Sequence, residues 1–528
     1  MSSSPVLARL QQTLQRHRER PALWLDGIHY SYHQLWQHAQ ALAQVLAQAP
    51  GPVCASLAER SLPAYCAPLA CLLANKIYLP LGLGQPLHRL NDILQRMQPG
   101  SVICDQAGSL LLAQPGLSLT RPAQQLWLDP QQRWHSQPAG PAATCAPPLD
   151  EPLCSAATAY VLFTSGSTGK PKGVAVGHAA LAHYLQAITQ RYPQLDHLQR
   201  SSQCFDPTFD LSLHDLLVCW ATGGCLYSLP RTALMFPAAF INEHQLTTWF
   251  CVPSMAASMR RMKQLAADSL PSLRLTLFCG EALPAPLADA WQAAAPNSRI
   301  DNLYGPTEAT IACTALQWQG QYPQLDVVPI GQPLAGLHAA VFDDNGKPCP
   351  DGRSGELWLA GPQLAGGYWG DPAQSAQRFV STDDPALPAR RWYRSGDRAR
   401  RDAQGQLHYL GRMDRQVKVR GYRIELQDVE AQLRAVFAGG QHYPLLAVIA
   451  TPHSDPLLGS ELVAFIEQPG LDLAATMAAL RRQLPDYMLP SRLLVLAQMP
   501  FNSSGKIDYP ALAAQLAGPA TPPKQTTA

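Results

Sequence analysis

From about residue 48 to about residue 340, short apolar runs alternate with amphipathic stretches. Runs such as Ser101–Cys104 and Tyr160–Phe163 have the length of buried strands, and the stretches between them suit helices. Elements that alternate in this way pack as layers, because sheets and helices bury their apolar surfaces against each other. The pattern therefore predicts α/β layers for this part of the chain.

The first residues of the chain predict two helices and a hairpin. Apolar residues at helical spacing run from Val6 to Leu14, a hairpin-like stretch covers Ala22–Tyr32, and a second helix covers His33–Ala47. One later segment departs from the alternation, since Gln114–Pro152 is rich in proline, glutamine and alanine. We expect that segment to be an irregular excursion on the surface.

The sequence changes character after Gly355, where segments typical of strands replace the alternation. An α+β stretch then runs from Glu425 to about Leu516. The expected fold class is α/β, with a large N-terminal domain of α/β layers that includes a β-rich subdomain, and a small α+β C-terminal domain. The strand-like segments are Glu356–Ala360, His408–Leu410 and Gln416–Val419.

A charged turn at Gly411–Asp414 lies between two of these strands and marks the expected domain boundary. We expect an N-terminal core over residues 1–411 and a C-terminal domain over residues 412–517. The tail over residues 518–528 has the composition of a disordered end.

Composition narrows the classes of protein that fit this chain. Its 528 residues are 47% hydrophobic and 15% charged, which is typical of a folded protein. A net charge of +2 argues against nucleic-acid binding through a broad basic surface, and no apolar run approaches the roughly 20 residues that span a bilayer. The 13 cysteines form no Cys-x-x-Cys pair, and the N-terminus lacks a signal segment. We therefore expect a cytoplasmic protein with reduced thiols and no zinc site.

A loop rich in glycines and hydroxyls follows the apolar run that ends at Phe163. Its glycines permit a ligand to approach closely, and its hydroxyls, N–H groups and lysines can hold a polyphosphate. A Walker-type loop is excluded, because that pattern needs glycine in place of Thr164 and Ser or Thr in place of Pro171. A flexible linker is the alternative, although a linker does not normally follow a buried strand. The loop is Thr164-Ser165-Gly166-Ser167-Thr168-Gly169-Lys170-Pro171-Lys172-Gly173.

Together with four later motifs, this loop resembles the adenylate-forming superfamily of acyl-CoA synthetases, luciferases and adenylation domains of nonribosomal peptide synthetases. The motifs come in the family's order over nearly the whole chain. They are NLYGPTE at Asn302–Glu308, YRSGD at Tyr393–Asp397, GRMDRQVKVRGYRIE at Gly411–Glu425 and NSSGKID at Asn502–Asp508.

The resemblance implies a ligase that joins a carboxylic acid to a thiol through an acyl adenylate, with ATP and Mg²⁺ as cofactors. It implies catalytic roles for Lys506, which would bridge the substrate carboxylate and the α-phosphate, and for Thr307 and Glu308, the latter as the Mg²⁺ ligand. Tyr304 would stack on adenine, and Asp397 would accept hydrogen bonds from the ribose. The implied ATP-binding residues are Thr164, Ser165, Gly166, Ser167, Thr168, Gly169, Lys170, Lys172, Asn302, Tyr304, Gly305, Asp397 and Arg412.

The resemblance also implies a C-terminal domain that rotates between adenylation and thioester formation. Asp414 corresponds to the family's hinge residue. After the rotation, Lys418, Arg420 and Gly421 would replace Lys506 at the active site and face the phosphopantetheine arm.

The segment Phe209–Asp215 indicates which acid is activated. In family members that activate amino acids, an aspartate at the position of Asp210 pairs with the substrate ammonium, whereas Asp210 as a helix cap is the structural alternative. The implied pocket has no counter-charge for a basic side chain and suits a small amino acid. Its residues are Asp210, Leu211, His214, Cys251, Leu277, Cys279, Leu303, Ile311 and Ala312.

The expected partners are therefore a small amino acid and a separate phosphopantetheinylated carrier protein, with no nucleic acid and no membrane, in nonribosomal-peptide-type or related metabolism. No carrier motif follows Lys506, which favours a free-standing enzyme. Three alternatives stay open. The segment Phe278-Cys279-Gly280-Glu281 resembles the D-alanine–carrier-protein ligases. An acyl- or aryl-CoA ligase would lack Asp210, and a non-catalytic interaction protein would have lost Lys506, Glu308 or Asp397.

Overall fold

The computed structural model describes residues 4–119, 123–139, 158–166, 170–320, 322, 325–382, 387–389, 391–437, 444–453, 455, 457, 459–502 and 506–517. The chain divides into two compact units. The large unit comprises residues 1–83, 90–163 and 173–413. The small unit comprises residues 84–89, 164–172 and 414–528.

In the described part of the large unit, nine strands form one sheet, and the strands at its centre are parallel. Of these central strands, Thr248–Cys251 and Leu275–Phe278 are buried along their whole length, as expected for parallel strands covered on both faces. In spatial order the strands are β16 (Gln332–Pro333), β15 (Thr314–Trp318), β14 (Arg299–Tyr304), β13 (Leu275–Phe278), β12 (Thr248–Cys251), β10 (Arg200–Gln203), β11 (Cys225–Ser228), β1 (Pro21–Leu25) and β2 (Ile28–Ser31).

Eight described strands form a second sheet, in which β3, β4, β5, β6 and β8 run parallel. In spatial order they are β19 (Gly367–Tyr368), β9 (Lys172–Gly177), β8 (Thr158–Thr164), β4 (Ile77–Pro80), β3 (Val53–Leu57), β5 (Ser101–Cys104), β6 (Ala123–Leu128) and β7 (Trp134–Ala139).

The hairpin of β6 and β7 corrects one expectation. Residues 114–152 were expected to be irregular, but β6 pairs with β5 and β7 extends the sheet by one more strand. Only Ala123 and Leu126 are fully buried in β6, so the hairpin lacks the apolar alternation that marks a strand in sequence. Residues 140–152 lie outside the described residues.

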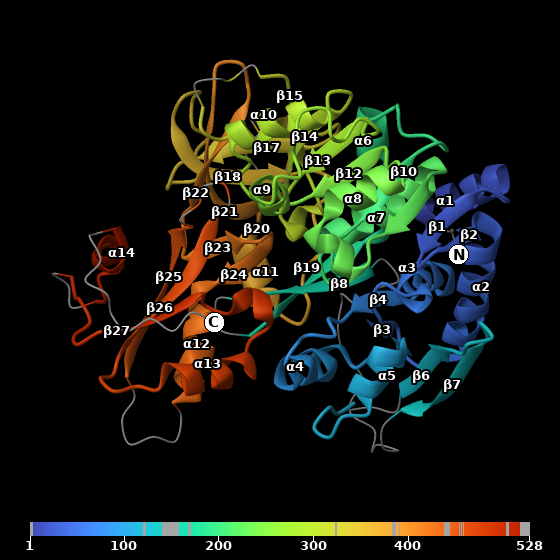
Figure 1. The fold of residues 1–528 in the computed structure, drawn as a ribbon, viewed down its shortest axis with the longest axis horizontal. Helices are drawn as coiled ribbons and strands as arrows, with labels where there is room; N and C mark the ends of the chain where they lie inside the picture. The colour runs from blue at the N-terminus through green and yellow to red at the C-terminus, as the bar shows by residue number, and fades with distance from the viewer. Residues whose placement is uncertain are drawn as a thin grey trace. The chain divides into compact units, whose positions relative to one another are not determined.

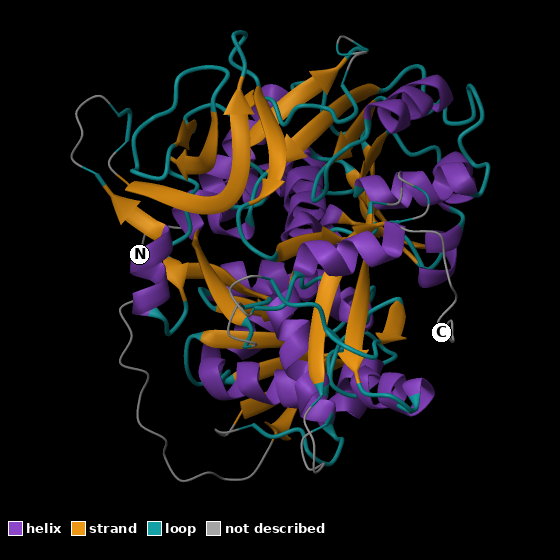
Figure 2. Cartoon of the chain, turned by 90° about the vertical axis from the view of Figure 1, so that its left-hand side faces the viewer, coloured by secondary structure: helices purple, strands orange, loops and turns teal. Residues whose placement is uncertain are grey.

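Helices lie against both sheets (Figure 2). Helix α2 begins with a capping box, in which Ser31 and Gln34 each accept the other's backbone N–H. Helix α7 packs against β10 and β11 (Figure 1) and ends at Gly223, whose positive φ of 91° terminates the helix. The helices are α1 (Pro5–His17), α2 (Tyr32–Gln48), α3 (Leu62–Ala74), α4 (Leu87–Met97), α5 (Gln106–Leu112), α6 (His178–Arg191), α7 (Asp210–Thr222), α8 (Pro237–Glu243), α9 (Pro253–Arg261), α10 (Ala285–Ala294) and α11 (Pro372–Arg378), with short 3₁₀ turns η1 (Arg231–Met235) and η2 (Thr307–Ala309).

A third, antiparallel sheet forms the β-rich part of the large unit. Strand β21 (Arg391–Arg401) lies between β18 (Ser354–Ala360) and β20 (Phe379–Ser381), while β17 (His338–Phe342) pairs with β18. Strand β22 (Leu407–Arg412) pairs with β21 across a bulge next to Asp397.

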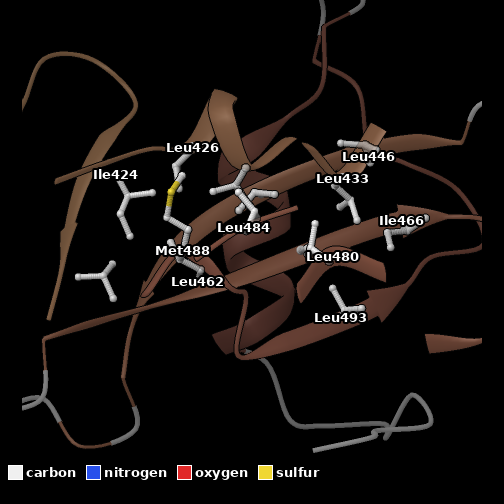
Figure 3. Packing of buried hydrophobic residues seen from close by; sticks show 14 residues of the cluster. Ile424, Leu426, Leu433, Leu446, Leu462, Ile466, Leu480, Leu484, Met488 and Leu493 are labelled. Carbon is white, nitrogen blue, oxygen red and sulfur yellow. The ribbon is translucent and has the colours of Figure 1, made fainter. Parts of the chain in front are cut away.

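The small unit has an α+β structure around its own core. Figure 3 shows leucines, isoleucines and a methionine from its helices and strands pointing toward one another, among them Leu433, Leu446 and Leu480. Its elements are β23 (Gln416–Val419), β24 (Tyr422–Glu425), α12 (Leu426–Val436), β25 (Leu445–Pro452), β26 (Ser460–Glu467), α13 (Leu473–Arg481), η4 (Asp486–Met488), β27 (Arg492–Val495) and α14 (Tyr509–Ala517).

The expected fold class is confirmed, as a large α/β unit with a β-rich part and a smaller α+β unit. The predicted tail over residues 518–528 lies outside the described residues. Among the helices that the structure describes, none is long and apolar enough to cross a membrane.

Candidate active site

Four parallel strands of the nine-stranded sheet bring the predicted pocket residues to one edge. The carboxyl ends of β10, β12, β13 and β14 meet there, since these strands run in the same direction. Asp210 follows β10, Cys279 follows β13, and Leu303 lies near the end of β14. Ligands of parallel α/β sheets bind at this edge, so the topology supports the predicted location of the pocket.

Asp210 lies in the first turn of α7 and is only 4% exposed. It is not the helix cap, because the N-cap residue is Phe209. The turn before the helix is held instead by Asp206, whose Oδ1 accepts hydrogen bonds from the backbone N (2.8 Å) and Oγ1 (2.5 Å) of Thr208. The N-terminus of a helix favours a nearby negative charge, so the first turn of α7 is a suitable place for a carboxylate.

His214 lies one helical turn after Asp210 and is also 4% exposed. Its Nδ1 is 2.5 Å from the hydroxyl of Tyr184 on α6, and its ring meets the Phe250 ring edge to face at 4.5 Å between centroids. Burial lowers the pKa of His214 to about 3, so the imidazole is neutral at physiological pH.

The buried His214 predicts a pH-dependent stability. Its folded pKa of about 3 lies below the ordinary 6.5, so between these values the unfolded chain binds a proton that the folded chain does not. Stability should therefore fall as the pH drops through this window. Between about pH 7 and pH 4.5 we expect a loss of about 2 kcal/mol from this residue. Urea melts at both pH values should show a smaller loss for His214→Gln, and an equal loss in both proteins would contradict the prediction.

One face of the nine-stranded sheet carries the predicted pocket residues Leu277 and Leu303. The parallel register aligns Phe250 with Leu277, and Leu277 with Asp301. Aligned residues share a face of a sheet, and Leu303 lies on the same face because it is two residues after Asp301. This is the face that His214 approaches, since His214 contacts Phe250.

Cys251, which the sequence placed in the pocket, belongs to the other face. It is aligned with Phe278, whose ring meets Trp291 of α10 at 5.4 Å. Side chains alternate along a strand, so Phe250 is the residue of β12 that lines the His214 side, and Cys251 is not.

Two other predicted pocket residues, Ile311 and Ala312, lie in or next to a strained turn. Thr310 and Ile311 have φ of 57° and 71°, a region that β-branched residues rarely adopt. The buried side chain of Gln363 holds this turn, since its Nε2 donates to the carbonyl oxygens of Thr310 (3.4 Å) and Ala312 (2.9 Å). The hydroxyl of Thr310 in turn donates to the backbone carbonyl oxygen of Gln363 at 2.6 Å. These bonds fix the backbone that carries Ile311 and Ala312.

Three predicted nucleotide-binding residues contact one another in the large unit. The Tyr304 hydroxyl donates to Oδ2 of Asp397, and Nη1 of Arg412 donates to Oδ1 at 2.9 Å. Burial and the charge of Asp397 raise the pKa of Tyr304 well above its ordinary value, so the hydroxyl keeps its proton. The structure thus brings Tyr304, Asp397 and Arg412 together.

Asn302 and Gly305 lie beside this group on the same strand and its following loop. The Asn302 amide nitrogen donates to the carbonyls of Val328 (3.2 Å) and Pro329 (3.0 Å), while its Oδ1 is buried without a partner among the described residues. A Cβ at Gly305 would lie 2.6 Å from the Cα of Ala312, so only glycine fits against the strained turn.

Glu308 is fully buried in η2, one residue after the partly buried Thr307, and its Oε1 accepts a hydrogen bond from the Tyr368 hydroxyl at 2.8 Å. The described residues contain no cluster of three or more metal-ligating side chains. A single carboxylate nevertheless fits Mg²⁺, which takes most of its ligands from phosphates and water.

The predicted phosphate loop and catalytic lysine belong to the small unit. A Cβ at Gly166 would lie 2.0 Å from the Lys170 carbonyl, so the loop is too tight there for any other residue. The hydroxyl of Ser165 donates to the Arg423 carbonyl at 2.7 Å, and Oγ1 of Thr164 is buried without a partner in the described chain. Lys170 is exposed, Lys172 is buried, and Ser167, Thr168 and Gly169 lie outside the described residues.

Lys506 has an exposed side chain in a turn with a well-bonded backbone. Its N–H donates to Oδ1 of Asn502 at 3.0 Å, and the Asn502 N–H donates back to the Lys506 carbonyl at 2.8 Å. Phe501 and Ile507 pair on either side. The turn therefore holds its backbone while the ammonium group stays free to reach a ligand.

The predicted hinge residue is followed in sequence, within a few positions, by the residues of the predicted thiolation face. Asp414 is exposed, and its Oδ1 accepts the Gln416 N–H at 3.2 Å just before β23. Lys418 lies in β23, while Arg420 (φ 51°) and Gly421 (φ 81°) form the two-residue turn to β24. Two positive φ angles in succession are typical of a tight hairpin turn.

Residues 10–369 match the sequence model described as "AMP-binding enzyme". The chain belongs to this family. The match covers most of the large unit, including the pocket edge of the nine-stranded sheet and the loop that follows Phe163.

Curated relatives of this AMP-binding enzyme include enzymes of antibiotic synthesis. It is 32% identical over 94% of its length to tyrocidine synthase 1 of Brevibacillus parabrevis, of which it spans 43%. It is 32% identical over 99% of its length to novobiocin biosynthesis protein H of Streptomyces niveus, of which it spans 86%. The chain spans less than half the length of the first curated relatives it matches.

Solved structures show the same fold over nearly the whole chain. The adenylation domain AlmE of Vibrio cholerae, solved in complex with glycyl-adenosine-5'-phosphate, has a TM-score of 0.84 and 32% identity, with 98% of both chains covered. Holo-PA1221, a protein with adenylation and carrier (PCP) domains, has a TM-score of 0.77 and 26% identity, with 96% of this chain and 83% of that chain covered.

Three residues near the pocket of this AMP-binding enzyme were not found from sequence. Phe250 is adjacent to Cys251, which the sequence predicts in the pocket. Tyr184 and Gln363 contact residues 30 and 51 positions away, and no motif marks either of them. Only their hydrogen bonds reveal that they support the pocket.

Proposed function

We propose that this AMP-binding enzyme activates a small amino acid with ATP as an aminoacyl adenylate and passes it to the phosphopantetheine thiol of a separate carrier protein. The buried carboxylate of Asp210 carries this proposal. It lies at the ligand-binding edge of a parallel sheet, beside predicted pocket residues that include no lysine or arginine. A buried carboxylate at this edge can pair with the ammonium group of an amino acid, and an acid without an amine has no such group to offer.

The chain's residues would support the first step as follows. The substrate carboxylate attacks the α-phosphorus of ATP, and pyrophosphate leaves. Two anions approach each other in this step, so positive charge at the reacting atoms stabilises the transition state. Lys506 supplies that charge from an exposed turn. Thr307 donates to a phosphate oxygen and Glu308 would hold Mg²⁺, which when bound neutralises phosphate charge.

The nucleotide would be held by the group around Asp397. Its carboxylate has lone pairs beyond those used by Tyr304 and Arg412, and these suit the ribose hydroxyls. The unpartnered Oδ1 of Asn302 suits the amino group of adenine. The loop from Thr164 to Lys172 would hold the phosphates through its hydroxyls, N–H groups and lysines.

The similar proteins favour a small substrate and a carrier as acceptor. AlmE was solved with a glycyl adenylate, and PA1221 contains a carrier domain together with its adenylation domain. The thioester step would use Lys418, Arg420 and Gly421 after rotation at Asp414. We include a cytoplasmic location in this proposal.

Amino-acid-dependent exchange of pyrophosphate into ATP tests the first half. We expect exchange with at least one small member among the proteinogenic amino acids and D-alanine. Exchange that requires D-alanine would favour the D-alanine–carrier ligase. Activation of acyl or aryl acids without an amine would favour a coenzyme A ligase.

The second half is tested by comparing the rate of thioester formation on a carrier protein with the rate on coenzyme A.

The hinge assignment predicts that Asp414→Pro impairs the two halves unequally. Proline fixes φ and removes an N–H, so the rotation that thioester formation needs should be blocked. Adenylation, measured by pyrophosphate exchange, should change far less than thioester formation, measured by loading of a carrier. Asp414→Ala is the control, because it removes the same carboxylate and leaves φ free. Equal losses of both halves in the proline variant would refute the assignment.

A further inference from the structure

Tyr184 and His214 form a buried polar pair next to Asp210. Tyr184 is 1% exposed and His214 is 4% exposed, and the hydroxyl oxygen of one is 2.5 Å from Nδ1 of the other. Tyr184 lies on α6 and His214 on α7, and these two helices pack against each other. A buried pair of this kind fixes the orientation of both side chains.

The direction of the hydrogen bond follows from the protonation states. Burial raises the pKa of Tyr184 well above its ordinary value, so its hydroxyl is protonated, and His214 is neutral at pH 7. Among the described residues the Tyr184 hydroxyl has no second acceptor. If it accepted from Nδ1–H, its own hydrogen would be buried without a partner, which is unfavourable. Tyr184 therefore donates to Nδ1, and the imidazole proton lies on Nε2.

The Nε2–H group is available to a ligand. No protein group in the described chain bonds Nε2, and Nε2 is not among the buried nitrogen atoms sealed from solvent. Asp210 lies four residues before His214 in α7, so the two residues share one face of this helix. Tyr184 is close enough to Asp210 and Cys279 for both residues to influence its hydroxyl electrostatically. The imidazole edge thus lies among the residues that would surround the substrate.

We propose that Tyr184 fixes the Nε2–H tautomer of His214, so that the pocket presents a hydrogen-bond donor to the substrate side chain. The preferred substrate is then an amino acid with a short side chain that ends in an acceptor, such as a hydroxyl group. This inference rests on the proposed function, because it specifies the side chain at that same site. Tyr184 is a positioning residue, since it acts through His214.

The Nε2–H group of His214 would discriminate between amino acids, because it has no hydrogen-bond partner when the substrate side chain lacks an acceptor. An amino acid of equal size without an acceptor leaves the Nε2–H group buried and unpaired, and such a mismatch typically reduces kcat/KM by about tenfold or more. Removing the Tyr184 hydroxyl lets the imidazole place its proton on either nitrogen, so the preference should weaken.

Pyrophosphate exchange with matched substrate pairs tests the inference on the native protein. L-Serine and L-alanine differ by one oxygen, and L-threonine and L-valine have the same shape. We expect the hydroxyl member of at least one pair to have a kcat/KM at least about tenfold higher. Glycine or alanine as the best substrate would overturn the inference and leave the proposed function intact. Exchange with no amino acid would overturn both.

Two tyrosine variants separate positioning from stability. Tyr184→Phe should reduce the hydroxyl preference by about fivefold or more, chiefly through KM. Tyr192→Phe is the matched control, because Tyr192 is equally buried and donates to Oδ2 of Asp301 at 2.9 Å, which Arg191 also binds. The control should keep the preference of the native protein. A preference that survives Tyr184→Phe, or falls equally in both variants, would overturn the inference.

NMR spectroscopy tests the tautomer of His214 without an activity assay. In protein labelled with ¹⁵N-histidine at about pH 7, the His214 signals should show the Nε2–H tautomer, with assignment by their loss in His214→Gln. Tyr184→Phe should shift these signals toward a mixture of tautomers, and Tyr192→Phe should not. An Nδ1–H tautomer in the native protein would overturn the inference.

Discussion

The Lys506→Ala variant should lose adenylate formation by about 10²-fold or more, which is the usual effect of removing a preorganised group that stabilises charge in the transition state. Thioester transfer from a supplied aminoacyl adenylate should be spared, because that step involves no approach of two anions. Pyrophosphate exchange measures the first half, and loading of a carrier from synthetic adenylate measures the second.

Lys347→Ala is a suitable control for this variant. Lys347 is also an exposed lysine in a turn, where its N–H donates to Oδ1 of Asp343, but it is assigned no role in the reaction. Its loss should leave both halves within about twofold of the native rates, as is usual for surface substitutions. Near-normal exchange in Lys506→Ala would remove this lysine from the proposed mechanism.

The Asp210→Ala variant should lose specificity for its amino acid by several hundred-fold or more. Removing one partner of a buried ion pair typically costs about 3–5 kcal/mol, and here the partner left behind is the substrate ammonium. The loss should fall on kcat/KM for the amino acid, while binding of ATP is spared. A deaminated analogue of the substrate should be poor with the native protein and relatively less penalised with the variant.

Asp206→Ala provides the matched control, because Asp206 is another carboxylate and lies four residues before Asp210, in the turn that precedes α7. Its two bonds to Thr208 hold the turn before α7, so its loss should lower stability by about 1 kcal/mol with little change in amino-acid preference. If the native protein activates the deaminated analogue as well as the amino acid, Asp210 has only a structural role. The enzyme would then be an acyl ligase.

The elements that the sequence predicted well are those with a strong local pattern. Gln416–Val419 and Ser101–Cys104 are strands with the predicted bounds, and the helix predicted at 33–47 differs from α2 by one residue at each end. The hairpin of β6 and β7 was missed because its strands are rich in glutamine and bury few side chains. Pairing with β5 gives this hairpin a β structure, and such pairing is a tertiary effect.

The site could be predicted where motifs carry the chemistry and could not where the support comes from elsewhere. The sequence identified Asp210 and His214 on one helix face, but it gave no sign of Phe250, which contacts His214. Neighbouring residues of a strand face opposite sides of the sheet, so the register is needed to assign Phe250 to the His214 side. Tyr184 and Gln363 act through hydrogen bonds to distant parts of the chain, and a lone sequence contains no signal for such contacts.

The turn held by Gln363 divides the pocket wall into positions that can vary and positions that cannot. Leu277 and Leu303 extend from regular strands, so exchanges there alter the size of the pocket while the backbone stays in place. Thr310 and Ile311 have positive φ, so any exchange there also changes the energy of the backbone itself. Relatives of this enzyme that change substrate should therefore differ first at the strand positions, and the glutamine should persist while the substrates diverge.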